Sequence, residues 1–464
     1  MDQEQIDLLR WLVPGLTEVP ASSLYWVNRA RKALATSTQD RDVYPVVDHS
    51  RGHGCWLYDI EGNEYLDANS GVAVRALGFR PKGIEEFERR IGSVVEELPG
   101  HDFDNIPQTL LAERLAALAP GDFAKEVFFS TSGARAVETA LKAAMDQTGR
   151  QRFVAFRPAF HGRTGYALSM TASKAVVKEG FPQALAVTRV PYAYPYRCPV
   201  GSDPDVAAQY SLDMLRDAIL DEGTDIAGII VESIAGEGGI IPPPPAFLQG
   251  LREIADQYGA VLIADEVQSG LGRSGKWWAI EYAGVEPDMI CTAKSLGGGY
   301  PLGATIGRAP MFERAARHAE TFSAEPRAAL LSLFVLKSIE EQGLVENARQ
   351  VGNQMLDELR TSIGDNPFVG DIRGLGFMQG VEFVQSRESK HHDPELRNRI
   401  VKNCIFNQRL WVLGAGRSTI RFLPPLTMTS EEGAETVSRF ARAVAEETGA
   451  AVGTAFASAG TAAR

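Results

Sequence analysis

Two residues that could perform chemistry stand at the ends of predicted buried strands. Asp265 follows the apolar run Val261–Ala264, and Lys294 follows the predicted strand Asp288–Thr292 and precedes three glycines, Gly297–Gly299. Ligands bind at the carboxyl ends of parallel strands in open α/β sheets, so both positions could face a ligand. A lysine desolvated there would have a lowered pKa and could act as a nucleophile. The alternatives are a paired structural acid and a solvated surface lysine.

A short polar motif could bind an anion. Thr131, Ser132, Gly133 and Ala134 lie between a predicted strand and a predicted helix. Free N–H groups and a hydroxyl at a helix N-terminus suit a phosphate group. An ordinary Ser or Thr N-cap is the alternative.

Two further stretches could contact a ligand. Phe160, His161 and Arg163 share one short segment, where the ring could stack on a cofactor and the guanidinium could bind a carboxylate. A core phenylalanine and a surface arginine are the alternative. Arg421 lies within the apolar stretch Thr419–Pro425, where a buried guanidinium needs an anionic partner. That partner could be a substrate carboxylate or a structural acid.

No metal site is expected. His391 and His392 lie in the polar, charged stretch Ser386–Asp393, and no second ligand pair stands at zinc spacing. We expect both histidines in a solvated loop.

The elements that must position these residues alternate between short buried strands and helices from about residue 105 to 310. This alternation predicts a mostly parallel sheet covered on both faces. A hairpin over residues 56–66 should precede this layer, and a long helix over 326–359 and a smaller α+β unit with strands at 369–383 and 418–426 should follow it. The predicted strands within the layer are Glu126–Ser130, Arg152–Phe156, Ile226–Val231, Ala260–Ala264 and Asp288–Thr292, with helices marked by Ala134–Met145 and Phe247–Ala255.

Composition excludes several classes of protein. The 464 residues carry a formal net charge of −12 without any Lys/Arg-rich run, which argues against nucleic acid or an anionic membrane as partner. The four cysteines are far apart, which argues against a zinc site or a disulfide framework and favours a reducing compartment. The acidic N-terminus does not resemble a signal peptide, and no apolar stretch is long enough for a membrane helix. We therefore expect a cytoplasmic protein.

Taken together, the motifs resemble those of the class III pyridoxal-phosphate aminotransferases of fold type I, from about Tyr44 to Leu426. The spacing of Asp265 and Lys294 matches that of the family. The chain looks most like an archaeal-type subgroup that contains ornithine aminotransferases and amino-acid racemases. The stretches that carry the likeness are Val231–Gly239, Ile263–Gly275, Thr292–Gly299, His161–Thr164, Thr171–Lys174 and Val190–Arg197.

The resemblance implies an α/β fold with two domains. The large cofactor domain, residues 76–345, would contain a mostly parallel seven-stranded sheet flanked by helices. The smaller α+β domain would combine residues 346–446 with the N-terminal segment 1–75, and residues 447–464 would form a disordered tail. The active sites would lie at the interface of a homodimer or of a dimer of dimers.

The resemblance also implies the cofactor, pyridoxal 5′-phosphate, and the residues that bind it. Lys294 would form the internal aldimine and carry the proton between Cα and C4′, and Asp265 would pair with the pyridine nitrogen. The remaining cofactor contacts would come from Ser132, Gly133 and Ala134 at the phosphate, Phe160 and Val267 on the two faces of the ring, His161, Glu232 as a nearby acid, Gln268 at the 3′-oxygen, and Thr321 at the phosphate of the neighbouring subunit.

Three residues would bind the substrate. Arg421 would bind an α-carboxylate, Glu237 would pair with Arg421 when an ω-amine enters, and Arg163 would bind a distal carboxylate. The implied reaction moves an ω-amine, such as that of ornithine or 4-aminobutyrate, to 2-oxoglutarate. A racemase or epimerase on the same fold is the alternative. A non-catalytic binding module is disfavoured because Lys294 and Asp265 are both present.

Three regions depart from the family pattern, and one of them is Glu232–Gly236, which reads Glu-Ser-Ile-Ala-Gly where the family usually has Glu-Pro-Val/Ile-Gln-Gly. In the phosphate loop, Thr131 replaces Asn, Ala134 replaces Thr and Arg135 replaces Glu, so one hydroxyl to the phosphate is lost. After Thr321 and Phe322, Ser323–Glu325 replaces Gly-Gly-Asn, which could alter substrate access.

Overall fold

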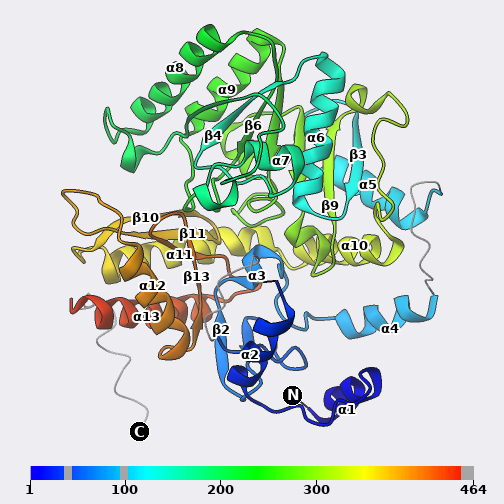
Figure 1. Cartoon of the computed structure of the whole chain (residues 1–464), viewed down its shortest axis with the longest axis vertical. Helices are drawn as coiled ribbons and strands as arrows, with labels where there is room; N and C mark the ends of the chain where they lie inside the picture. The colour runs from blue at the N-terminus through cyan, green and yellow to red at the C-terminus, as the bar shows by residue number, and fades with distance from the viewer. Residues whose placement is uncertain (1, 36–43, 95–102, 451–464) are drawn as a thin grey trace.

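The computed structural model describes residues 2–35, 44–94 and 103–450. A large α/β layer occupies the upper part of Figure 1, and a smaller unit built from both ends of the chain lies below it. The helix α10 (Pro326–Glu341) lies between the two.

The α/β layer is built on a seven-stranded sheet, as predicted. Its order is β3-β9-β8-β7-β6-β4-β5, and only β9 runs antiparallel to its neighbours. The central strands β6, β7 and β8 are buried along their whole length, because helices cover both faces. The strands are β3 (Lys125–Ser130), β4 (Arg152–Arg157), β5 (Val187–Pro191), β6 (Ile226–Glu232), β7 (Val261–Asp265), β8 (Met289–Thr292) and β9 (Gly303–Arg308).

Separate apolar cores cover the two faces of this sheet. On one face, α6 (Gly133–Thr148) packs Ala140 and Leu141 into a cluster with Phe153 and Ile263. On the other, α8 (Pro204–Glu222) and α9 (Pro245–Tyr258) pack together and join the largest cluster. The helices α5 (Ile106–Leu118) and α7 (Gly165–Met170) complete the cover. Helices therefore cover both faces of the sheet, and the strand ends remain available to a ligand.

The smaller unit brings distant segments into one core. The predicted hairpin forms between β1 (Trp56–Tyr58) and β2 (Glu64–Asp67), and β12 (Leu410–Trp411) adds parallel to β2. A separate four-stranded antiparallel sheet has the order β10-β11-β14-β13. Its strands and the helices around it are β10 (Val369–Leu375), β11 (Met378–Phe383), β13 (Leu413–Ala415), β14 (Thr419–Phe422), α11 (Leu344–Ile363), α12 (Pro394–Phe406) and α13 (Ser430–Thr448).

The N-terminal part contributes four further helices, α1 (Gln3–Leu12), α2 (Ser23–Ala33), α3 (Ser70–Ala73) and α4 (Ile84–Val94). Apolar side chains of residues 55–79 share a cluster with side chains of residues 335–444. This shared cluster supports the grouping of both chain ends in one domain, whose boundaries at 75, 345 and 446 stay predictions. Among the described residues, no helix is both long and apolar enough to span a membrane.

Four predicted elements need correction. The helix over 326–359 is two helices, because Gly343 has a φ of +63° and ends the first. The stretch 369–383 is the hairpin β10–β11 rather than one strand. The strand over 418–426 ends at Phe422, before two prolines that lack the N–H needed for a ladder. The predicted tail 447–464 begins inside α13, which continues to Thr448, and residues 451–464 lie outside the described residues.

Candidate active site

The strand order brings the predicted site residues to one edge of the sheet. Glu232 and Asp265 end the parallel strands β6 and β7 and are register partners, and Asp265 also pairs with Cys291 of β8. A cavity of about 450 Å³ lies at this edge. The predicted residues that line it are Ser132, Gly133, Ala134, Phe160, His161, Arg163, Glu232, Glu237, Asp265, Val267, Gln268 and Lys294.

Lys294 enters the cavity from the turn after β8. Its φ of +44° is unusual for a residue with a side chain, and such backbone conformations concentrate at functional sites. Burial, followed by the nearby positive charge of Arg421, lowers the pKa of the Lys294 amine to about 8. The amine is therefore partly neutral near physiological pH and can act as a nucleophile.

Asp265 is held in place by two hydrogen bonds. Oδ2 lies 2.7 Å from Nδ1 of His161, and Oδ1 accepts the backbone N–H of Val267 at 3.0 Å. The side chains of Asp265 and His161 are both buried. The hydroxyl of Thr171 accepts the backbone N–H of His161 at 3.0 Å, so it holds the imidazole segment from the other side. This arrangement fixes a carboxylate at the cavity wall.

Glu232 lines the cavity and joins two loops. Its carboxylate accepts the backbone N–H of Phe160 at 3.0 Å and that of Gly236 at 2.9 Å. Burial raises the pKa of Glu232 to about 7, and the negative charge of Asp265 adds to the effect. Glu232 therefore holds the backbone of Phe160 and carries only part of a charge at neutral pH.

The predicted anion motif forms the N-terminus of α6. Ser132 is the N-cap, and its Oγ accepts the N–H of Arg135 at 3.3 Å. The first N–H groups of a helix have no partner within the helix, so those of Gly133 and Ala134 can bind an anion. A Cβ on Gly133 would lie 2.7 Å from Cγ1 of Val267, so only glycine permits this close approach. Residues Thr131–Ala134 at this N-terminus therefore form a narrow cup that carries N–H donors.

An ion pair between distant segments lies at the site, where Glu237, but not Arg421, lines the cavity. Arg421 on β14 binds Glu237, which follows β6 in sequence, and the Arg421 side chain is only 5% exposed. Burial works against ionisation of Glu237, but Arg421 outweighs it and holds the pKa of this carboxyl below its usual value. The backbone oxygen of Glu237 also accepts the N–H of Gly416 at 2.8 Å. Arg421 thus has the anionic partner that its burial requires.

Three predicted residues differ from the rest in their placement. Thr321 is exposed and does not line the cavity of its own chain. Arg163 lines the cavity with its guanidinium 5.9 Å from the centre of the Phe160 ring, and it remains exposed. His392 corrects the prediction of a solvated loop, because it is partly buried and its Nδ1 lies 2.9 Å from Oγ of Ser418.

The sequence analysis missed two contributors. Thr171 anchors the backbone on both sides of His161, although it was part of a stretch that carries the family resemblance. Tyr300 lines the cavity while 55% exposed, and its place directly after Gly297–Gly299 was the available signal.

The residues present fit a planar ring with an anionic arm. The cavity offers one amine at Lys294, one fixed carboxylate at Asp265, an aromatic side chain at Phe160 and free N–H groups at the α6 N-terminus. Oε1 of Gln268 is buried at the cavity and has no hydrogen-bond partner among the described residues, so this acceptor is available to a donor group of a ligand. These features match the groups of pyridoxal 5′-phosphate.

Comparisons with known proteins agree with this geometry. The family described as "Aminotransferase class-III" matches residues 37–444. The 4-aminobutyrate aminotransferase of Escherichia coli is 35% identical over 88% of this chain and 96% of that protein. The acetylornithine aminotransferase of Archaeoglobus fulgidus is 34% identical over 88% of this chain and 97% of that protein.

A solved structure is similar over most of its length. An amine transaminase from an uncultivated Pseudomonas species, in its PLP-bound form, has a TM-score of 0.82 and 30% identity. The match covers 89% of this chain and 97% of that chain.

Proposed function

The chain belongs to the class III aminotransferase family, and from that premise we propose that it transfers the ω-amino group of a compound such as ornithine or 4-aminobutyrate to 2-oxoglutarate. It is an enzyme that depends on pyridoxal phosphate, a small-molecule amino donor and a keto-acid acceptor. The ion pair between Glu237 and Arg421 is the observation that supports an ω-amine as the amino donor.

The argument from this pair concerns the two substrates that one pocket must accept. A keto acid such as 2-oxoglutarate brings a carboxylate that needs a free guanidinium, whereas the amine end of an ω-amino acid brings none. Glu237 neutralises Arg421 in the structure, which suits the amine. If Glu237 turns away, Arg421 can form a bidentate bond with a carboxylate. Arg163 at the cavity wall can bind the carboxylate at the far end of the donor.

The other residues have the placement that the reaction requires. Pyridoxal phosphate, when bound, supplies an aldehyde that condenses with primary amines and a ring that withdraws electrons. Asp265 would hold a proton on the pyridine nitrogen, because its carboxylate is fixed by His161 and Val267. The neutral amine of Lys294 would take the proton from the carbon that carries the substrate's amino group.

We propose a homodimer or a dimer of dimers as the active form, with Thr321 at the partner's cofactor. An interface is supported by two exposed aromatic side chains: Tyr300, which lines the cavity and is 55% exposed, and Phe322, which follows Thr321 and is 56% exposed. We also propose a cytoplasmic location, which is supported by three buried, free cysteines, Cys55, Cys291 and Cys404.

An amino-transfer assay tests the function. Purified protein with pyridoxal phosphate, 2-oxoglutarate and either ornithine or 4-aminobutyrate should form glutamate and the matching aldehyde in equal amounts. A parallel reaction with an L-amino acid and no keto acid tests racemisation by loss of optical rotation. Loss of rotation without glutamate formation in the first assay would overturn the proposal in favour of a racemase.

A further inference from the structure

One face of α6 holds the segment that leads into Thr321. Arg135, Thr139, Lys142 and Asp146 follow one another at intervals of four, three and four residues, so their side chains lie on the same side of the helix. Each of them contacts the segment 314–320. The segment runs antiparallel to α6, and its end therefore reaches the cup at the N-terminus of the helix.

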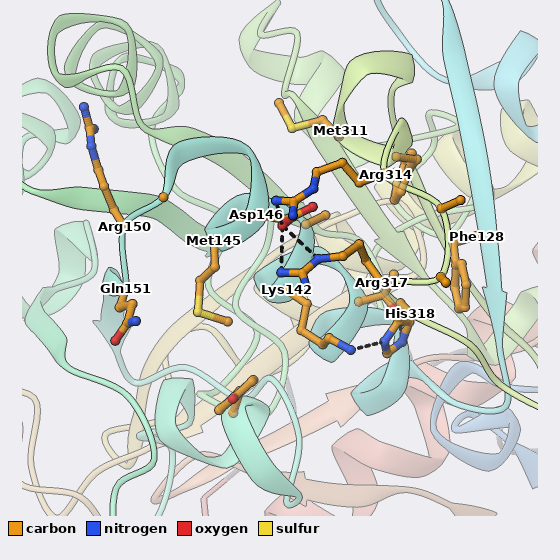
Figure 2. A pocket seen from close by; sticks show the side chains of 17 residues that line it. Phe128, Lys142, Met145, Asp146, Arg150, Gln151, Met311, Arg314, Arg317 and His318 are labelled. Atoms are coloured by element: carbon orange, nitrogen blue, oxygen red, sulfur yellow. Dashed lines mark hydrogen bonds and ion pairs between the residues drawn. The ribbon is translucent and has the colours of Figure 1, made fainter.

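Figure 2 shows the contacts near the C-terminal end of α6. Oδ1 of Asp146 lies 2.6 Å from Nη1 of Arg314 and 2.9 Å from Nη2 of Arg317. One turn closer to the cup, the His318 ring lies 2.7 Å from Nζ of Lys142 and 2.9 Å from Oγ1 of Thr139. These contacts fix the course of the segment over two turns of helix.

Glu320 makes the contacts nearest to the cup. Its Oε1 accepts the backbone N–H of Thr131 at 3.2 Å and the hydroxyl of the same residue, and it lies 3.7 Å from Nε of Arg135. The Glu320 side chain is only 10% exposed. Its second oxygen, Oε2, is buried and has no hydrogen-bond partner within the part of the chain that the structure describes. A nearly buried carboxylate thus sits between Thr131, which opens the cup, and Thr321.

The charges explain two departures from the family pattern together. An arginine in the first turn of a helix opposes the helix dipole, and a carboxylate beside an anion cup would repel a phosphate. Glu320 and Arg135 neutralise each other, and Thr131 donates two hydrogen bonds to the same oxygen. Thr131 and Arg135 therefore both contact the carboxylate of Glu320.

We propose that Glu320 is a positioning residue for the cofactor phosphate. It ties Thr131, at the entry of the cup that would bind the phosphate, to the segment whose Thr321 would reach the phosphate in the neighbouring subunit. This inference rests on the proposed function, since it takes the phosphate of pyridoxal phosphate as the ligand of the cup. Arg135 supports Glu320 by neutralising it.

Titration of the apoenzyme with pyridoxal phosphate, followed by protein fluorescence, tests this role. Glu320→Ala should raise the Kd about tenfold or more, because the cup entry and the segment separate. Glu320→Gln keeps an oxygen for Thr131 but loses the ion pair, so its Kd should rise less. Arg135→Gln should weaken binding, and adding it to Glu320→Gln should have a smaller effect than adding it to wild type.

Asp146→Ala is the matched control, because it releases the same segment at the end far from the cup. Its Kd should stay within about threefold of wild type. The proposal is overturned if Glu320→Ala leaves the Kd unchanged while lowering the apoenzyme's Tm, or if Asp146→Ala weakens binding equally. Wild-type protein that binds no pyridoxal phosphate would instead overturn the proposed function.

Discussion

Nδ1 of His161 lies 2.7 Å from Oδ2 of Asp265, and both side chains are buried and line the cavity. Since a carboxylate oxygen accepts, Nδ1 of His161 donates this hydrogen bond. Nε2 has no hydrogen-bond partner among the described residues. The hydrogen bond from the imidazole therefore fixes the orientation of the Asp265 carboxylate.

The first prediction concerns the hydrogen bond from His161 to Asp265. His161→Ala should weaken cofactor binding about tenfold to a hundredfold, because a hydrogen bond to a charged group contributes roughly 1.5–3 kcal/mol. His161→Asn should recover part of the loss, since its amide can donate to Asp265. Titration of the apoenzymes measures both. His391→Ala, on an exposed loop, is the control, and equal affinities in all variants would show that His161 does not position Asp265.

The second prediction uses the pKa of Lys294. With a pKa of about 8, roughly a quarter of the amine is neutral at pH 7.5, against about one in a thousand at the ordinary lysine value. The initial rate at which the apoenzyme attaches pyridoxal phosphate covalently should therefore rise with pH, reach half its maximum near pH 8 and level off above about pH 9. Borohydride trapping followed by peptide mass analysis measures the rate at this residue.

Lys294→Ala is the control for this measurement. It should remove the trapped adduct while leaving non-covalent binding, because the cup and Asp265 are unchanged. A trapping rate in the wild type that still climbs steeply between pH 9 and 10 would contradict the lowered pKa. Near wild-type turnover by Lys294→Ala would contradict its catalytic role.

Buried apolar runs were sufficient to predict the strands that carry the site. Ile226–Val231 and Ala260–Ala264 are continuous and apolar, and each ends in a carboxylate that the structure places at the same edge of the sheet. Neither β5 nor β9 was predicted. β5 ends in Pro191 at the sheet edge, and β9 contains two glycines and is defined by pairing with strands distant in sequence.

Side-chain contacts across long sequence separations could not be predicted from the residues. His161 and Asp265 are 104 positions apart, and Thr131 and Glu320 are 189 apart. Neither motif contains a signal for its partner, because the contact depends on how the strand ends are brought together. The pairing of Glu237 with Arg421 was predicted only through the family resemblance, and the structure confirms that they pair.

The third prediction concerns that pair. Glu237→Ala would leave Arg421 open to carboxylates, so the ratio of α-amine to ω-amine turnover should rise about tenfold or more, the scale of one charge-assisted hydrogen bond. Arg421→Ala should slow the 2-oxoglutarate half-reaction more than the amine half-reaction. Stopped-flow absorbance measures the half-reactions separately. If Glu237→Ala leaves the ratio of α-amine to ω-amine turnover unchanged and lowers the Tm, Glu237 has only a structural role.

The last prediction is a pH dependence of stability at His318. Burial, then the positive charges of Lys142 and Arg135, lower the pKa of His318, whereas Glu320 acts in the opposite direction. The Phe128 ring, 4.8 Å away between ring centres, shields the imidazole further. The neutral ring accepts from Lys142 at Nδ1 and donates from Nε2 to Thr139, so protonation would break the first of these hydrogen bonds.

The sign follows from proton binding. The unfolded chain protonates His318 near the ordinary value of about 6.5, whereas the folded protein resists protonation until a lower pH. The stability that the neutral ring contributes is therefore complete above about pH 6.5 and is lost as the pH falls. The difference in free energy of unfolding between wild type and His318→Gln should shrink from pH 7.5 to pH 5, as measured by urea denaturation. His391→Gln should show no such trend, and a His318→Gln difference that is constant or grows toward pH 5 would contradict the lowered pKa.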